Sequence, residues 1–194
     1  IRSIRNSSLN THIIAVDPSP YAAGLYWADS FHLVPFADDP NYIDQIINII
    51  ELERPDALLV GTDVELHTFS KKRKSFENEF GIQILVSSKR VIDIADDKYL
   101  TYKFLKEKGF DYPRTCLPGN EDKLVEEIGF PLIVKPRVGA RSYGVYKINN
   151  YNELKRLIKT EENILIQECV ATEEQEYTAS AIVFNGKCNA SIVM

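Results

Sequence analysis

The sequence predicts an α/β protein in which a parallel-sheet unit is followed by a smaller α+β unit. Short apolar runs alternate with amphipathic helical stretches through the first half of the chain, which is the pattern of a parallel sheet covered by helices. In the second half, glycine-containing turns join apolar runs, as in hairpins. With 194 residues, of which 44% are hydrophobic, the chain can bury a core and can hold one large domain or two small ones. We expect two.

The first unit, residues 1–87, has strand patterns that alternate with helix patterns. The strands are expected at residues 12–16, 31–34, 57–60 and 82–86. Isoleucines recur at helical spacing after the second strand, and Asp39 can cap that helix, with Pro40 at its first position. Thr62 and Glu65 form a capping box for the next helix. This order predicts a Rossmann-like sheet domain that lacks its first strand.

A helical bridge, residues 88–111, leads to the second unit, residues 112–194. Gly109 ends the last helix of the bridge, and Asn185-Gly186 predicts a tight hairpin near the end of the chain. The remaining elements are a helix at 121–128, a helix at 151–159 and strands near 114–117, 132–134, 145–148, 164–170 and 176–184. We expect the chain to be a fragment, with this second unit truncated at its C-terminus.

Composition argues against several classes of function. A net charge of −5 leaves no basic stripe for broad nucleic-acid binding, and the basic run at residues 71–74 is expected to be a solvated helix face. Three widely spaced cysteines without a CxxC pair suit a reducing cytosol, so we expect a cytoplasmic protein. No apolar stretch reaches membrane-spanning length, and isolated histidines do not predict a metal site.

The most informative stretch is residues 131–145, Pro-Leu-Ile-Val-Lys-Pro-Arg-Val-Gly-Ala-Arg-Ser-Tyr-Gly-Val. A short apolar run ends at Lys135, and a loop with Gly139, Ser142 and Gly144 follows. A lysine at the end of a strand, next to a glycine loop with free backbone N–H groups, is suited to hold phosphate. An ordinary hairpin with a surface lysine would give the same local pattern.

Two further segments extend this pattern. Residues 164–170, Ile-Leu-Ile-Gln-Glu-Cys-Val, predict a strand that ends in a polar pair, and an acidic loop then leads to a strand that opens with Glu176. Upstream, Ala-Asp-Asp-Lys at residues 95–98 opens a helix. In their order and spacing, these three elements resemble the nucleotide-binding half of the ATP-grasp ligases.

Within that family, the N-terminal runs Val16–Ser19 and Gly61–Glu65 make the chain similar to the large subunit of carbamoyl phosphate synthase. That enzyme, however, usually has arginine at the positions that correspond to Lys98 and Lys135. A stand-alone ATP-grasp carboxylate–amine ligase therefore remains an equal candidate.

The resemblance implies how this chain would bind the phosphates of ATP. Lys98 and Lys135 would each direct an ammonium group at the triphosphate, a task that suits a compact charge on a flexible side chain. The loop over the phosphates would consist of Gly139, Ala140, Arg141, Ser142 and Gly144. At Arg141 the family usually has glycine, so either this loop is stiffer or Arg141 adds a guanidinium contact to phosphate.

The resemblance also implies how the base and the sugar would be bound. The segment that corresponds to the lining of the adenine pocket is Gln167, Glu168, Cys169 and Val170. Recognition there would use the backbone C=O of Glu168 and the backbone N–H of Val170. Glu176 corresponds to an acidic residue that accepts hydrogen bonds from the ribose hydroxyls. For both glutamates, the alternative is an exposed carboxylate at a strand end.

The family's reaction transfers the γ-phosphoryl group of ATP to a carboxylate, and a nucleophile then attacks the acylphosphate. The resemblance therefore implies ATP and Mg²⁺ as cofactors, a small carboxylate or bicarbonate as substrate, and an amine or ammonia as acceptor. A homo-oligomer is compatible with this class. The metal ligands and catalytic residues of the family lie in a later segment, so we expect them outside this chain, which would bind ATP weakly and would not turn over.

Two other functions use parts of the same pattern. In a nicotinamide-dependent oxidoreductase, Asp17 at a strand end could bind a ribose, although that interpretation leaves Lys135 and Glu176 without a role. A non-catalytic ATP-sensing module would share all of the binding residues. It would differ from an enzyme only in lacking the metal-binding segment.

Overall fold

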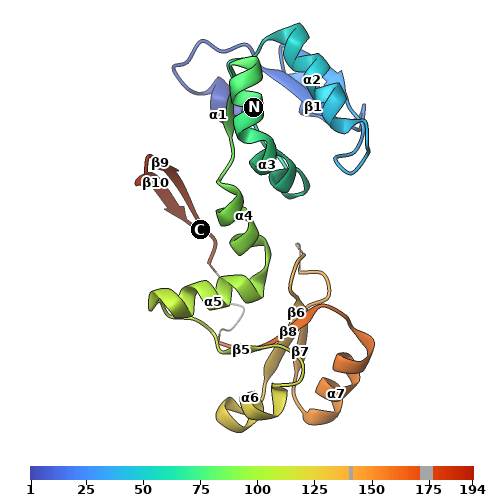
Figure 1. Ribbon diagram of the computed structural model, residues 1–194, viewed down its shortest axis with the longest axis vertical. Helices are drawn as coiled ribbons and strands as arrows, with labels where there is room; N and C mark the ends of the chain where they lie inside the picture. The colour runs from blue at the N-terminus through green and yellow to red at the C-terminus, as the bar shows by residue number, and fades with distance from the viewer. Residues whose placement is uncertain (140–141, 171–176) are drawn as a thin grey trace. The chain divides into compact units, whose positions relative to one another are not determined.

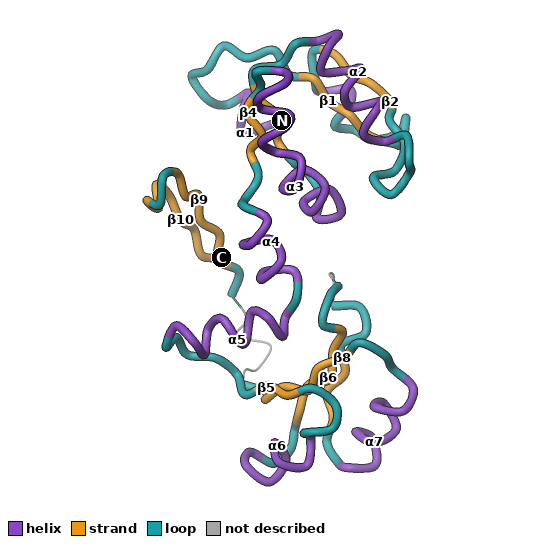
Figure 2. Tube along the Cα trace, in the orientation of Figure 1, coloured by secondary structure: helices purple, strands orange, loops and turns teal. Residues whose placement is uncertain are grey.

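The computed structural model describes residues 1–139, 142–170 and 177–194. The chain divides into two compact units, Ile1–Asp93 and Ile94–Met194 (Figure 1). Each unit has a hydrophobic core of its own. Both units contain helices and strands (Figure 2), which confirms the predicted α/β class.

Short strands of the first unit pair in parallel. β1 (Ile14–Asp17) pairs with β2 (Ser30–Leu33), and β3 (Ala57–Leu59) pairs with β4 (Gln83–Leu85). α1 (Arg2–Arg5) precedes the first strand, and η1 (Leu25–Trp27), α2 (Tyr42–Glu53) and α3 (Asp63–Phe80) lie along the chain between successive strands. Parallel neighbours need such crossover connections, so the alternating sequence pattern leads directly to this arrangement.

The core of the first unit lies between α2, α3 and the strands. Ile46 and Ile50 of α2 are buried with Ile84 of β4. Phe69 and Phe76 of α3 are also buried there, with their rings edge to face at 6.2 Å. This core therefore depends on one apolar stripe from each of the two helices.

Two of the expected helix caps are wrong. α2 begins at Tyr42 after Asn41, not at Pro40, because the Asp39 carboxylate accepts a hydrogen bond from the backbone N–H of Asn41 and forms a turn instead. Thr62 does precede α3, but its hydroxyl donates to the carboxylate of Glu65, and its oxygen does not cap a backbone N–H group of the helix. The other carboxylate oxygen of Glu65 accepts from the hydroxyl of Tyr42, so the expected capping box does not form.

The second unit contains an antiparallel sheet in the order β5-β8-β6-β7. Its strands are β5 (Thr115–Cys116), β6 (Leu132–Pro136), β7 (Tyr146–Ile148) and β8 (Ile164–Glu168). The helices are α5 (Lys98–Lys108), α6 (Glu121–Ile128) and α7 (Tyr151–Thr160), and α4 (Lys89–Asp96) runs across the boundary between the units. The expected helical bridge is thus two helices, α4 and α5, which are separated at Asp97.

The two faces of this sheet have different surroundings. Leu132 and Val134 of β6 and Ile166 of β8 are fully buried in a core with the apolar residues of α6 and α7. Because side chains alternate along a strand, Ile133, Lys135 and Gln167 point to the opposite face. One face of the sheet therefore packs against the hydrophobic core, and the other face carries Lys135.

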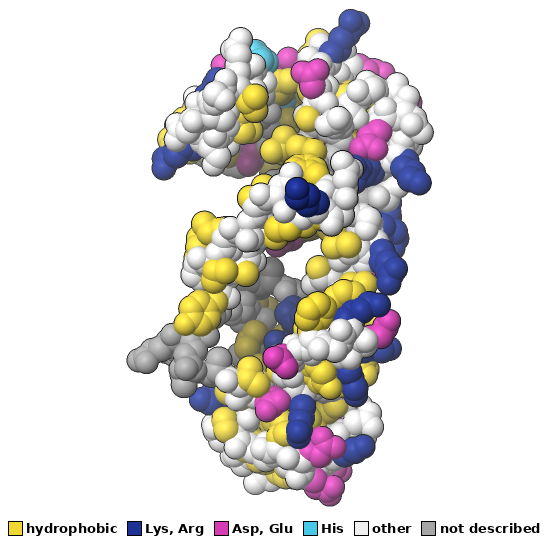
Figure 3. Space-filling model, turned by 90° about the vertical axis from the view of Figure 1, so that its left-hand side faces the viewer, with side chains coloured by type: hydrophobic (Ala, Val, Ile, Leu, Met, Phe, Trp, Pro, Cys, Tyr) yellow, Lys and Arg dark blue, Asp and Glu magenta, His cyan; other side chains and the backbone are white. Residues whose placement is uncertain are grey.

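The chain ends in an antiparallel hairpin of β9 (Ala179–Phe184) and β10 (Lys187–Val193). Asn185 and Gly186 have φ angles of 51° and 74°, the positive values that a two-residue hairpin turn requires. The hairpin is exposed along its whole length, and hydrophobic side chains are visible on the face drawn in Figure 3. Within the described part of the chain, no helix combines the length and apolar character needed to cross a membrane.

Candidate functional site

Lys135 is the fourth residue of β6, on the face of the sheet that lies opposite the core. Its Nζ donates a hydrogen bond of 2.7 Å to Oε1 of Gln167 on the neighbouring strand β8. The acceptor is a neutral amide, so the contact orients the ammonium group without compensating its charge.

Lys98 is the first residue of α5, and its side chain reaches the loop that follows β6. Its Nζ donates to the backbone carbonyl of Gly139 at 2.7 Å, and the carbonyl of Arg137 lies at 3.5 Å. The backbone N–H of Lys98 also donates to the Arg137 carbonyl, at 2.9 Å. These contacts fasten the start of α5 to the loop.

The two ammonium groups are close enough to repel each other. Burial, followed by the positive charge of Lys98, lowers the pKa of Lys135 below its ordinary value. Among the described residues, the ion pairs include neither lysine. The site therefore holds two positive charges whose partners are neutral oxygens.

The loop between β6 and β7 contains backbone conformations that favour glycine. Gly139 and Gly144 have φ angles of 146° and 70°, and Ser142 between them also has a positive φ, 56°. A Cβ atom at Gly144 would lie 3.0 Å from Cγ of Pro136, so the loop returns close to the strand from which it left. Only a residue without a side chain allows this approach together with this φ angle.

Asp97 and Arg137 form a second link between α5 and the loop, which we did not predict from the sequence. Arg137 Nε and Nη2 donate to the two carboxylate oxygens of Asp97, and the guanidinium lies over the ring of Tyr99, 5.5 Å from its centroid. Asp97 also accepts from the backbone N–H groups of Tyr99 and Leu100. Burial acts to raise the pKa of Asp97, but these hydrogen bonds outweigh burial and leave the pKa below its ordinary value.

The predicted adenine segment runs from the end of β8 into the next loop. Glu168 is anchored to Arg114: its backbone N–H donates to the Arg114 carbonyl at 2.8 Å, and its carboxylate accepts from the Arg114 N–H at 3.0 Å. Cys169 is a half-buried free thiol, and Val170 is 64% exposed. The Glu168 side chain thus has a local structural role, and the expected role of its backbone stays a prediction.

Three of the predicted residues, Ala140, Arg141 and Glu176, lie outside the described residues. Asp17, the residue on which an oxidoreductase would depend, accepts a hydrogen bond of 2.8 Å from the backbone N–H of Ser19. It has the turn-forming role that aspartate often has before proline. In the described part of the chain, no group of histidine, cysteine and acidic residues could hold a metal ion.

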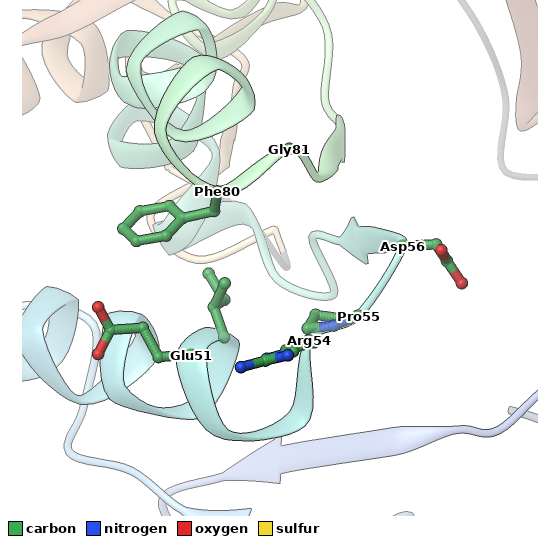
Figure 4. A pocket seen from close by; sticks show the side chains of 7 residues that line it. Glu51, Arg54, Pro55, Asp56, Phe80 and Gly81 are labelled. Carbon is green, nitrogen blue, oxygen red and sulfur yellow. The ribbon is translucent and has the colours of Figure 1, made fainter.

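A surface pocket in the first unit contains none of the predicted residues. It lies where the C-terminal ends of α2 and α3 come together, and in Figure 4 Phe80 faces the residues of α2 across it. Its lining consists of Ile50, Glu51, Arg54, Pro55, Asp56, Phe80 and Gly81. The pocket combines one guanidinium with two carboxylates, which makes it a poorer site for a polyanion than the pair of lysines in the second unit.

Comparison with known protein families matches both units. Residues 1–85 match the PylC-like, N-terminal domain, and residues 95–193 match the ATP-grasp domain. The second match includes every residue that we predicted to contact a nucleotide.

Curated relatives include the carbamoyl phosphate synthase large chains of Methanosarcina mazei and Clostridium acetobutylicum. The chain is 25% identical to the first over 181 residues and 26% identical to the second over 185 residues, which is 87% and 90% of this chain. It spans 16% of the length of each of these relatives.

Solved structures with a similar fold include a synthetase and a biotin carboxylase domain. The N5-carboxyaminoimidazole ribonucleotide synthetase of Thermotoga maritima has a TM-score of 0.64 and 26% identity, and the match covers 93% of this chain and 46% of that one. The biotin carboxylase domain of the Hydrogenobacter thermophilus 2-oxoglutarate carboxylase, determined with MgADP and bicarbonate, has a TM-score of 0.63 at 16% identity, covering 86% of this chain and 40% of that one. At that identity, the second likeness concerns the fold alone.

Proposed function

The chain belongs to the ATP-grasp family, and on that premise we propose that its second unit is the ATP-binding portion of a ligase that joins a carboxylate to an amine. The observation that carries the proposal is the pair Lys98 and Lys135, two ammonium groups without carboxylate partners among the described residues, beside a glycine-containing loop. Two like charges at close range are stabilised by an anion between them, and a triphosphate is such an anion.

The chemistry of this family would require only positioning and charge from these residues. The lysines would neutralise the triphosphate as its γ-phosphoryl group moves to a carboxylate oxygen, and the loop that contains Gly139, Ser142 and Gly144 would cover the phosphates with its N–H groups. An acylphosphate would form, and an amine or ammonia would then displace its phosphate. Magnesium would accompany the nucleotide, but the described residues do not form a metal site, and we assign no metal ligand to this chain.

Two kinds of ligase remain candidates, and they differ in the carboxylate that they would activate. Similarity to carbamoyl phosphate synthase large chains supports bicarbonate or a related small carboxylate. Lysine at positions 98 and 135, where the synthases usually have arginine, supports a separate carboxylate–amine ligase. Both candidates need the same ATP site.

Calorimetric titrations with ATP and with NAD test this proposal. We expect ATP to bind and NAD not to bind. The affinity for ATP should be low if segments outside this chain complete the site. Millimolar affinity is still detectable by chemical-shift changes in NMR spectra, so a weak result can be distinguished from no binding. Binding of NAD without binding of ATP would refute the proposal and would favour an oxidoreductase.

A further inference from the structure

We infer that Thr115 and Gln167 are positioning residues that aim the ammonium group of Lys135 at the anion in the proposed site. The inference rests on the proposed function, since a nucleotide phosphate is that anion. Its basis is a continuous chain of hydrogen bonds. Lys135 Nζ donates to Gln167 Oε1 at 2.7 Å, Gln167 Nε2 donates to Thr115 Oγ1 at 2.8 Å, and Thr115 Oγ1 donates to the carbonyl of Pro113 at 2.8 Å.

The direction of this chain is determined at its Pro113 end. A backbone carbonyl can only accept a hydrogen bond, so the hydroxyl of Thr115 donates its single proton to Pro113. Thr115 Oγ1 can then only accept from the other side, which requires the NH2 group of Gln167 there. The carbonyl oxygen of Gln167 consequently faces Lys135. If the amide turned over, its NH2 group would face the ammonium and the bonds on both sides of Gln167 would be lost.

The order of the strands brings these side chains together. β8 lies between β5 and β6, so Gln167 can reach a residue on either neighbour. Thr115 is its register partner on β5, and Ile133, two residues before Lys135, is its partner on β6. Register partners and residues two apart share one face of a sheet. Thr115 is only 6% exposed, so water competes little for its hydroxyl.

A neutral acceptor suits the task better than a carboxylate. Burial and the charge of Lys98 both favour loss of the proton from Lys135, and a carbonyl oxygen that accepts from the ammonium opposes that loss. A glutamate at position 167 would orient the ammonium equally well, but it would also neutralise the charge that the phosphate needs. Gln167 therefore orients the ammonium group of Lys135, favours its protonated form and leaves its positive charge free to interact with the phosphate.

The test compares Thr115→Val, which removes the hydroxyl at nearly constant volume, with Thr115→Ser, which keeps the hydroxyl. One measurement is the pKa of Lys135, from the NMR signal of ¹³C-labelled Cε without nucleotide, and the other is the dissociation constant for ATP. We expect Thr115→Val to lower the pKa of Lys135 and to weaken ATP binding about three- to tenfold, the effect of one lost hydrogen bond. Thr115→Ser should leave both close to the wild-type values.

An unchanged pKa of Lys135 in Thr115→Val would overturn the inference. Equal losses of ATP affinity in the valine and serine variants would do the same, because they indicate packing and not hydrogen bonding. If Thr115→Val does not fold, Gln167→Glu takes its place: it should raise the pKa of Lys135 while weakening ATP binding, and tighter ATP binding would contradict the inference. The two proposals can also fail separately. If the wild-type protein does not bind ATP but Thr115→Val still shifts the pKa of Lys135, the hydrogen bonds from Lys135 to Pro113 are supported and the proposed function is refuted.

Discussion

Arg137 contacts both carboxylate oxygens of Asp97 across a separation of 40 residues in the sequence. Asp97 caps α5, and Arg137 follows directly on the last residue of β6. The contact therefore fixes the start of the helix that carries Lys98 against the strand that carries Lys135. We regard this pair as the structural support that keeps the two ammonium groups within reach of one ligand.

Replacement of Asp97 should destabilise the second unit to a degree that depends on the new side chain. Asparagine is also a good helix cap, so Asp97→Asn should lose mainly the charge pair with Arg137, at a cost of about 1 kcal/mol. Asp97→Ala should lose the cap as well and cost about 1–3 kcal/mol. Urea unfolding of both variants measures the difference. Equal stabilities of the asparagine variant and the wild type would show that the charge pair contributes nothing.

The contribution of Asp97 should disappear in acid. Its pKa is lowered in the folded chain: burial acts to raise it, and the hydrogen bonds from Arg137 and from the backbone outweigh burial. The stabilisation is therefore complete above the unfolded-state pKa of about 4 and is lost as the pH falls through the folded-state value. The difference in unfolding free energy between the wild type and Asp97→Asn should be constant near neutral pH and should shrink below about pH 4. A difference that persists in acid would assign the effect to something other than the charge.

Loss of the ammonium at Lys135 should weaken ATP binding and stabilise the fold. Lys135→Met removes one charge-assisted contact, which should cost about 1–3 kcal/mol of binding free energy. Because burial and repulsion by Lys98 lower the pKa of Lys135, the charged form is unfavourable in the folded chain without ligand, so its removal should raise the unfolding free energy at neutral pH. Titration calorimetry and urea unfolding measure the two effects.

The control for this variant is Lys159→Met, because Lys159 is an exposed lysine in the last turn of α7. It should change neither ATP affinity nor stability by more than about 0.5 kcal/mol. If Lys135→Met binds ATP as the control does, Lys135 is not part of the site.

Substitution of Gly144 should distort the loop beside the site. Gly144→Ala would place a Cβ 3.0 Å from Cγ of Pro136 at a φ of 70°, and both the clash and the backbone conformation are unfavourable, by about 1–2 kcal/mol or more. Gly61→Ala is the control, since Gly61 has no heavy atom within 4 Å of such a Cβ and no positive φ. We expect lower stability and weaker ATP binding for the first variant only. Equal stability and equal ATP affinity of the two variants would mean that the loop accommodates a side chain at position 144.

Helix and strand ends that depend only on neighbouring residues in the chain could be predicted from the sequence. The helix expected at residues 121–128 has the observed bounds, because a stretch of helix formers ends there at a glycine. The end of β6 near Lys135 follows from an apolar run and the loop residues after it. The expected capping box at Thr62 is wrong because Tyr42, from another helix, takes part of the Glu65 carboxylate, and no local pattern contains that competition.

The supporting contacts of the site could not be predicted in this way. As a cap, Asp97 is recognisable from its position before a helix, but its partner Arg137 is 40 residues away and has no local signal beyond a positive charge. Thr115 contacts Gln167 only because β5 is the neighbour of β8 in the sheet. That neighbour relation depends on the packing of the whole unit, and the sequence of a two-residue strand does not contain it.

A crystal structure of the chain with a non-hydrolysable ATP analogue would show directly whether Lys98 and Lys135 hold the nucleotide. We expect triphosphate oxygens within about 4 Å of Nζ of both Lys98 and Lys135, the distance of an ion pair. A nucleotide bound elsewhere, for example beside Arg54 in the pocket of the first unit, with the two lysines unchanged, would contradict this expectation.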